Sequence, residues 1–181
     1  MIVAISLQLL LLVYHQLTTL FDFYPFNGIR FSQPKERYTE AVINFTLMVL
    51  PLLGYLFKIS SLMRFGAAFY FILFACEIAT WFVPYFFGAS PKWQEIYSRV
   101  QGRTIMLIPP RGQNPTPNLE HLILMALTMA TGIATFTAYW SLPEASTKGW
   151  PIAAGIAAFM LYGIAVTHWK LPTKSAGNRA S

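Results

Sequence analysis

The sequence predicts an all-α integral membrane protein with five transmembrane helices in a bundle. Of its 181 residues, 55% are hydrophobic and only 11% are charged, and the mean hydropathy is +0.48. Soluble domains carry about 25% charged residues, so this deficit indicates a chain that lies in a bilayer. We expect a single membrane domain over residues 1–169 and a flexible basic tail over residues 170–181.

The first apolar run, residues 1–21, has the length of a membrane span. A cleaved signal peptide would need a basic start and a small-residue cleavage site, but no lysine or arginine precedes Arg30. We therefore interpret this run as the first helix. The polar connection that follows, residues 22–39, carries aromatic side chains typical of a membrane interface and a turn signal at Asn27 and Gly28.

Four further apolar runs complete the predicted bundle. Pro51 and Gly54 interrupt the second run, and membrane helices tolerate both residue types. The last run is rich in alanine and glycine, which favours close helix packing within the chain or, as the alternative, in a homodimer. The predicted spans cover residues 40–57, 65–87, 119–142 and 150–169, with short turns at 58–64 and 143–149.

The longest interruption is the polar segment of residues 88–118, which we expect to form an ordered cap over the bundle. Loops of this length are usually functional or disordered, and this one has apolar groups to bury. Residues 91–100 are predicted to form a short amphipathic helix, with Trp93, Ile96, Tyr97 and Val100 on one face. That face should rest on the mouth of the bundle or on the lipid headgroups.

Basic residues predict the orientation. With five spans, ten lysines and arginines fall on one side of the membrane and three on the other. Such a bias places the richer side in the cytoplasm. We therefore expect the N-terminus outside, and the C-terminus and the segment 88–118 in the cytoplasm. The net charge of +6 then reflects orientation and contact with membrane lipid, and does not indicate a nucleic-acid partner.

Polar side chains inside the spans mark the candidate site, because they are costly in lipid. Glu77 lies about ten residues inside the third span, roughly 15 Å along a helix. His15 and His121 lie at a similar depth on two other spans, so we expect the three to converge as the catalytic group. The predicted ligand-binding residues are the pocket-lining Trp81 and Tyr85, the polar Glu40, Asn44 and Glu120, and the cationic Arg37, Arg99 and Arg103.

Three chemistries remain open for such a site. A carboxylate and a histidine can act as general acid and base, and arginines can hold a phosphate or carboxylate headgroup. A metal centre of His15, His121 and Glu77 with Glu40 or Glu120 is less favoured, because these ligands are scattered singly and form no H-x-x-H pattern. Each polar residue also has a structural interpretation, as a helix cap or a buried hydrogen bond.

Several functions are excluded. The single cysteine, Cys76, cannot form an intrachain disulfide or a paired-thiol redox site. No phosphate-binding glycine loop, dinucleotide fingerprint or nucleophile elbow is present, and no cofactor can be named.

The function that we predict is binding or converting a small amphiphilic molecule, lipid- or isoprenoid-like, at the inner leaflet. The alternative is a non-catalytic subunit or assembly factor that docks on a membrane-protein partner through residues 88–118. A carrier is less favoured, because the chain has no internal repeat.

Overall fold

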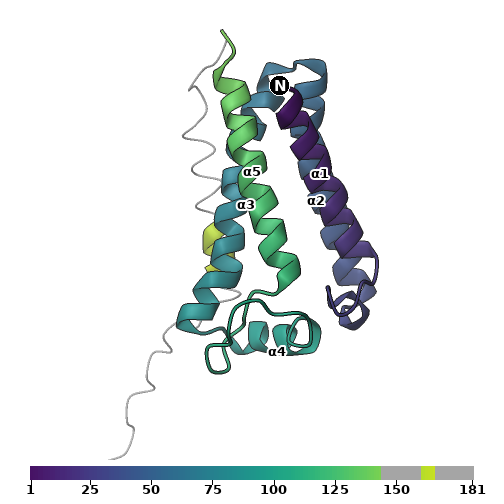
Figure 1. The fold of residues 1–181 in the computed structure, drawn as a ribbon, viewed down its shortest axis with the longest axis vertical. Coiled ribbons are helices and arrows are strands. Elements are labelled where there is room, and N and C mark those ends of the chain that lie inside the picture. Colours follow the sequence, from purple (N-terminus) through teal and green to yellow (C-terminus); the bar gives the residue numbers. More distant parts are fainter. Residues whose placement is uncertain (144–159, 166–181) are drawn as a thin grey trace, which may run out of the picture.

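The structure is a computed structural model that describes residues 1–143 and 160–165. Four long helices form an antiparallel bundle: α1 (Ile2–Leu20), α2 (Pro34–Phe57), α3 (Ser60–Phe87) and α5 (Leu119–Trp140). Each is long and apolar enough to cross a membrane. The helix α1 packs on α2 and α5, and α3 packs on the same two, so the four helices form a closed ring (Figure 1).

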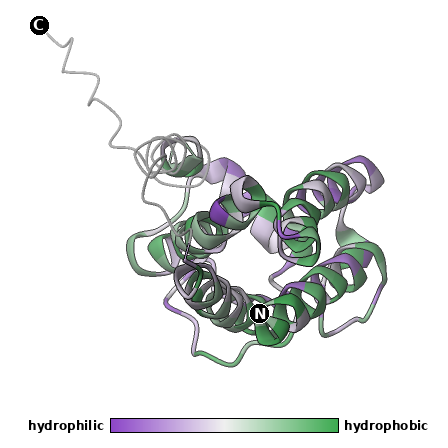
Figure 2. Cartoon of the chain, turned by 90° about the horizontal axis from the view of Figure 1, so that it is seen from above, coloured by the Kyte–Doolittle hydropathy of each residue, from purple (hydrophilic) through white to green (hydrophobic). Residues whose placement is uncertain are grey.

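These helices confirm the predicted all-helical bundle of apolar helices. The predicted fifth span and the basic tail lie outside the described residues, except that residues 160–165 are helical. In the part of the chain that is described, the outer faces of the helices are mostly apolar (Figure 2), as a lipid-facing surface requires. Examples of exposed apolar side chains are Leu9, Leu10, Val13, Val42, Ile43, Phe45, Ile133 and Phe136.

The two ends of the bundle differ. At one end α1 and α3 finish, α2 and α5 begin, and the short helix α4 (Pro91–Val100) lies at the foot of the bundle (Figure 1). We call this the α4 end. At the other end lie the N-terminus, the turn between α2 and α3 and the last turn of α5; we call this the hairpin end.

Local sequence explains where the helices begin. The helix α2 starts with Pro34 and a capping box between Gln33 and Glu36, and therefore extends before the apolar span predicted from residue 40. Asn118 caps α5 by accepting from the His121 N–H. Ser90 caps α4 by accepting from the Trp93 N–H, which confirms the helix predicted at residues 91–100.

The connection between α2 and α3 is shorter than predicted. The turn expected over residues 58–64 consists of Lys58 and Ile59 alone, because α3 begins at Ser60. Lys58 has a φ of 56°, the left-handed conformation that ends a helix and reverses the chain. Gly54 permits the tight turn, since a Cβ there would lie 2.6 Å from the Leu62 Cβ.

Two apolar clusters fill the interior from the hairpin end to the middle of the bundle. The outer cluster contains Ala4, Tyr55, Met63, Ala67, Ala138 and Tyr139. The inner cluster contains Leu11, Leu12, Met48, Leu52, Phe69 and Tyr70. Every helix of the ring contributes to at least one cluster, so these residues hold the four helices together.

At the α4 end, turns and loops tie α4 to the bundle. The 3-10 helix η1 (Ile29–Phe31) contacts α4. Gly28 lies so close to the end of α4 that a Cβ there would overlap the Val100 carbonyl oxygen. After α4 the chain returns to the connection before α2, where the Ile105 N–H donates to the Pro25 carbonyl at 3.0 Å. These contacts hold α4 and the loop after it against the connection between α1 and α2.

Candidate functional site

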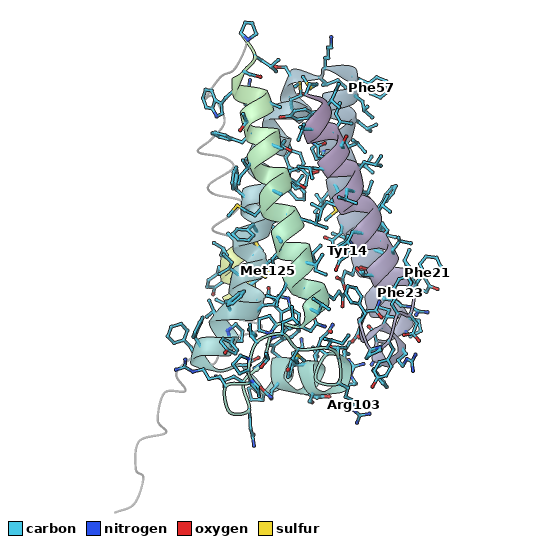
Figure 3. The ribbon with its side chains drawn as sticks, in the orientation of Figure 1. Tyr14, Phe21, Phe23, Phe57, Arg103 and Met125 are labelled. Carbon is cyan, nitrogen blue, oxygen red and sulfur yellow. The ribbon has the colours of Figure 1, made fainter. Side chains whose placement is uncertain are left out.

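A cavity of about 440 Å³ lies at the α4 end, lined by residues of all four bundle helices, of α4 and of the segment 27–32; Figure 3 labels one of these residues, Met125. A cavity of this size suits a small organic ligand. Its apolar walls include Met48, Leu73, Leu124, Met125, Trp81, Trp93 and Val100. Its polar walls include His15, Thr18, Thr19, Asn27, Glu36, Glu40, Asn44, Glu77, Thr80, Gln101, Glu120 and His121.

His15 joins α1 to α2 across one side of the cavity. Its Nε2 atom lies 3.0 Å from the Asn44 Nδ2 and 3.9 Å from a carboxylate oxygen of Glu40. Its Nδ1 atom lies 3.4 Å from the Thr19 hydroxyl on the same helix. The ring is only 5% exposed, so these neighbours determine its orientation.

Glu77 joins α3 to α5 on the opposite part of the ring. Its Oε1 accepts a hydrogen bond of 2.9 Å from the Thr128 hydroxyl. That hydroxyl also lies 2.9 Å from the Leu124 carbonyl oxygen, and its single proton can serve only one of the two acceptors. The other oxygen, Oε2, is buried and has no hydrogen-bond partner among the described residues. Glu77, which is 9% exposed, therefore has unused acceptor capacity beside the cavity.

His121 lies at the start of α5, where Asn118 determines its state. The Asn118 side-chain nitrogen donates to Gln101 Oε1 at 2.8 Å and to Thr104 Oγ1 at 2.9 Å, which fixes the amide so that Oδ1 faces His121. That Oδ1 lies 2.6 Å from the His121 Nδ1. We therefore assign the imidazole proton to Nδ1, which leaves the Nε2 lone pair to accept a proton.

Two tryptophans link this histidine to α4. The Trp81 ring lies 4.0 Å from the His121 ring, centroid to centroid, and is 4% exposed. Trp93 of α4 packs edge-on against Trp81 at 5.6 Å. Glu120 is also buried in this region, with one carboxylate oxygen 3.9 Å from the His121 Nδ1. The position of α4 and the geometry of the histidine are therefore coupled.

Seven of the eleven predicted site residues line this one cavity: His15, Glu40, Asn44, Glu77, Trp81, Glu120 and His121. They come from all four bundle helices, although no short sequence motif connects them. The other four, Arg37, Tyr85, Arg99 and Arg103, do not line it.

Those four residues have other partners. Arg99 donates to Glu36 at 3.3 Å and to the Phe31 carbonyl at 3.1 Å. The Arg37 guanidinium lies 5.1 Å from the Tyr38 ring centroid, and that of Arg103 lies 5.6 Å from the Phe31 ring centroid. The Tyr85 hydroxyl donates to the Pro109 carbonyl at 3.0 Å and thus holds the loop after α4.

The cavity reaches the surface beside the start of α2. Glu36 and Glu40, one helical turn apart, line it, and their side chains are 45% and 59% exposed. The residues that follow on α2, Val42, Ile43 and Phe45, are apolar and exposed. The mouth therefore lies between a polar helix start and a lipid-facing surface.

Sequence reasoning did not identify the contribution of residues 27–32. Asn27 is 1% exposed, and its side-chain nitrogen donates to the Thr18 and Phe21 carbonyls at the end of α1, each at 2.8 Å. The Asn27 and Gly28 turn signal was visible in the sequence. That this turn folds under α4 and forms a wall of the cavity depends on contacts between distant segments.

Asp22, which follows α1, lies outside the cavity. It forms an ion pair of 2.9 Å with Arg30, and the hydrogen bond from that guanidinium holds the pKa of Asp22 below its usual value. Among the described residues, no three histidine, cysteine or acidic side chains are placed to hold a metal ion. The side chains that line the cavity are suited to acid–base chemistry and to hydrogen bonding.

No protein family, no curated protein and no solved structure matches this chain.

Proposed function

We propose that this protein binds, or converts by acid–base chemistry, a small amphiphilic molecule that enters from one leaflet of the membrane. The cavity at the α4 end supports this most directly, because it joins polar groups from four helices with apolar and aromatic walls. Buried polar groups are costly in a membrane protein and usually serve a function. A polar cluster beside an apolar wall suits a molecule with one polar end and one apolar body.

In this proposal Glu77 is the acid or base, or the polar anchor. Its hydrogen-bond capacity is only partly used, and it faces a cavity that also contains His15 and His121. The Nε2 of His121 carries the lone pair of the neutral ring and can accept a hydrogen bond from a ligand. A carboxyl and an imidazole in one cavity can move a proton on and off a substrate without a cofactor. The ligand would enter at Glu36 and Glu40, beside the lipid-facing side chains of α2, and α4 would cap the site.

We further propose that the α4 end faces the cytoplasm, so that the cavity opens at the inner leaflet. Seven of the nine lysines and arginines in residues 1–143 lie at this end: Arg30, Lys35, Arg37, Lys92, Arg99, Arg103 and Arg111. Only Lys58 and Arg64 lie at the hairpin end. In a Cys76→Ala background, Ser61→Cys should react with an impermeant thiol reagent on intact cells and Gln113→Cys should not. The reverse pattern would overturn the orientation.

The central experiment is to purify the protein in mild detergent, extract bound lipid and identify it by mass spectrometry. We expect a retained amphiphile in the wild type and its loss in Glu77→Gln, since glutamine keeps the shape and removes the acid. Glu95→Gln is the matched control, because Glu95 is an exposed carboxylate on α4 that does not line the cavity. A wild type without ligand, together with a Glu77→Gln variant that unfolds, would show that Glu77 is structural.

That outcome would favour the second candidate, a non-catalytic subunit or assembly factor. One observation supports it: the loop after α4 exposes apolar side chains, with Leu107 62% and Ile105 38% exposed. A partner could cover these groups. Co-purification with a membrane-protein partner that is lost in Leu107→Ser would support this candidate.

A further inference from the structure

The charges around the cavity are all of one sign. Four glutamates line it, and among the described residues no lysine or arginine does. One of the four, Glu36, is paired with Arg99. The remaining three, Glu40, Glu77 and Glu120, form no ion pair with a lysine or arginine in the described part of the chain; the basic side chains within 4 Å of Glu40 and Glu120 are histidines, each at 3.9 Å. The cavity therefore lacks the positive charge that would balance its carboxyl groups.

The arginines of the α4 end are directed elsewhere. Arg30 pairs with Asp22, and the guanidinium groups of Arg37, Arg103 and Arg111 lie over aromatic rings, the last at 5.6 Å from the Phe86 centroid. A phosphate or carboxylate in the cavity would thus meet carboxyl groups without a compensating cation, which is electrostatically unfavourable. The sequence had suggested that arginines hold an anionic headgroup, but the cavity has no such arrangement.

Glu77 gives a second, independent indication. It is 91% buried, since 9% of it is exposed, and its Oε2 has no donor among the described residues. Its Oε1 shares a single hydroxyl proton with the Leu124 carbonyl. A buried carboxylate normally accepts several hydrogen bonds. A hydrogen-bond donor placed beside Glu77 in the cavity would add to the single shared proton that this carboxyl group receives.

From these contacts we infer that the occupant is a cationic amphiphile, a protonated amine on an apolar body, whose ammonium group lies among the carboxyl groups of the cavity and donates to Glu77. This inference rests on the proposed function and names its ligand class. An ammonium group supplies up to three N–H donors and the missing positive charge. Trp81 and Trp93 offer aromatic walls that tolerate a cation, and Met48, Leu73 and Leu124 would contact the apolar body.

Three probes with the same alkyl chain distinguish the ligand classes: dodecylamine, dodecanol and dodecyl phosphate. The protein is placed in nanodiscs of zwitterionic lipid, and binding is followed by thermal stability and by tryptophan fluorescence, to which Trp81 and Trp93 in the cavity wall contribute two of the five tryptophans. We expect the amine to bind at least about tenfold more tightly than the alcohol, and the phosphate to bind most weakly. Glu77→Gln should lower the ratio of amine affinity to alcohol affinity about tenfold, and Glu95→Gln should leave this ratio unchanged.

The inference is overturned if dodecanol or dodecyl phosphate binds as tightly as the amine, or if Glu77→Gln keeps the full preference. Should Glu77→Gln fail to fold, Glu120→Gln removes another carboxyl group from the cavity and should likewise lower the preference for the amine. The failure of this inference is distinguishable from the failure of the proposed function. Tight binding of dodecanol alone would keep the amphiphile site and reject the amine, whereas no binding of any probe and no native ligand would reject both.

Discussion

Near the hairpin end, buried polar side chains bond across neighbouring helices; at the α4 end, polar side chains from the same helices line a cavity. The Tyr55 hydroxyl donates to the Thr135 carbonyl at 2.6 Å, and the Gln8 side chain donates to the Thr135 hydroxyl at 3.1 Å. Buried oxygens without a partner among the described residues occur on Gln8, Tyr70 and Glu77, and of these three residues Glu77 lines the cavity. Both ends belong to the same four helices, so the difference arises from what fills the space between them.

The two ends therefore have different roles: close packing at the hairpin end stabilises the bundle, and the α4 end contains the candidate site. At the hairpin end the helices approach closely: a Cβ on Gly66 would lie 2.6 Å from the Pro51 Cβ. Close approach maximises the van der Waals contact that holds membrane helices together. At the α4 end the helices leave room for a ligand, and α4 and residues 27–32 complete the wall. Changes at the hairpin end should therefore affect folding first, and changes at the α4 end should affect binding first.

The largest effect on stability is expected for Tyr55→Ala at the hairpin end. Tyr55 is 1% exposed, so truncation leaves a cavity and removes the hydrogen bond to the Thr135 carbonyl, which should cost about 3–5 kcal/mol of unfolding free energy. Tyr55→Phe keeps the ring and removes only the hydrogen bond, at a cost of about 1 kcal/mol. Denaturant unfolding in detergent measures both. Equal losses for the two variants would show that packing at this end does not dominate stability.

A smaller effect is expected for Gly28→Ala, which acts on the position of α4. The added methyl group would overlap the Val100 carbonyl oxygen, and the adjustment should cost about 1–3 kcal/mol. We expect ligand retention to fall as well, because α4 forms a wall of the cavity. Gly102→Ala is the control, since its Cβ would make only ordinary contacts of 3.4 Å or more. A Gly28→Ala variant with unchanged stability and ligand retention would show that this contact does not fix α4.

Trp93→Ala should weaken the packing of α4 on Trp81 by about 1 kcal/mol. Because the polar groups of the cavity remain, affinity for the retained ligand should fall without vanishing. Thermal stability and ligand content, measured on the same preparation, separate the two effects. Lys92→Ala, a change of an exposed neighbour, should alter neither. Complete loss of ligand in Trp93→Ala would assign Trp93 a direct binding role instead.

The smallest effect is expected for Asp22→Asn and depends on pH. The pKa of Asp22 is lowered in the folded protein by its hydrogen bond from Arg30, so the ionised form stabilises the fold. That stabilisation is present above the ordinary aspartate pKa of about 3.9 and disappears as the pH falls through the lower folded value. Asp22→Asn should therefore be slightly destabilising near neutral pH and equal to the wild type in strong acid. Because the pair is exposed, raised salt should reduce the difference.

Much of the fold is determined by local sequence. The four described spans follow from apolar runs of membrane length, and the helix starts follow from Pro34, Ser90 and Asn118, whose capping depends on neighbours within three residues. The amphipathic pattern of residues 91–100 was likewise enough to predict α4. The depth of Glu77 within its span could be counted directly. These features depend on interactions of short range along the chain, which is why the sequence alone defines them.

Only the tertiary structure decided which polar groups meet. His15, Glu77 and His121 line one cavity because the ring of helices places them there, whereas Arg99 pairs with Glu36, which lies 63 residues away in the chain. Tyr85 lies one helical turn after Trp81, and the sequence predicted that both residues line the pocket. The Tyr85 hydroxyl instead contacts the loop after α4. The short turn at Lys58 depends on Leu62 lying against Gly54. A charged group or hydroxyl forms a hydrogen bond with the group that packing places within about 3 Å. That distance between remote residues cannot be deduced from a pattern along the chain.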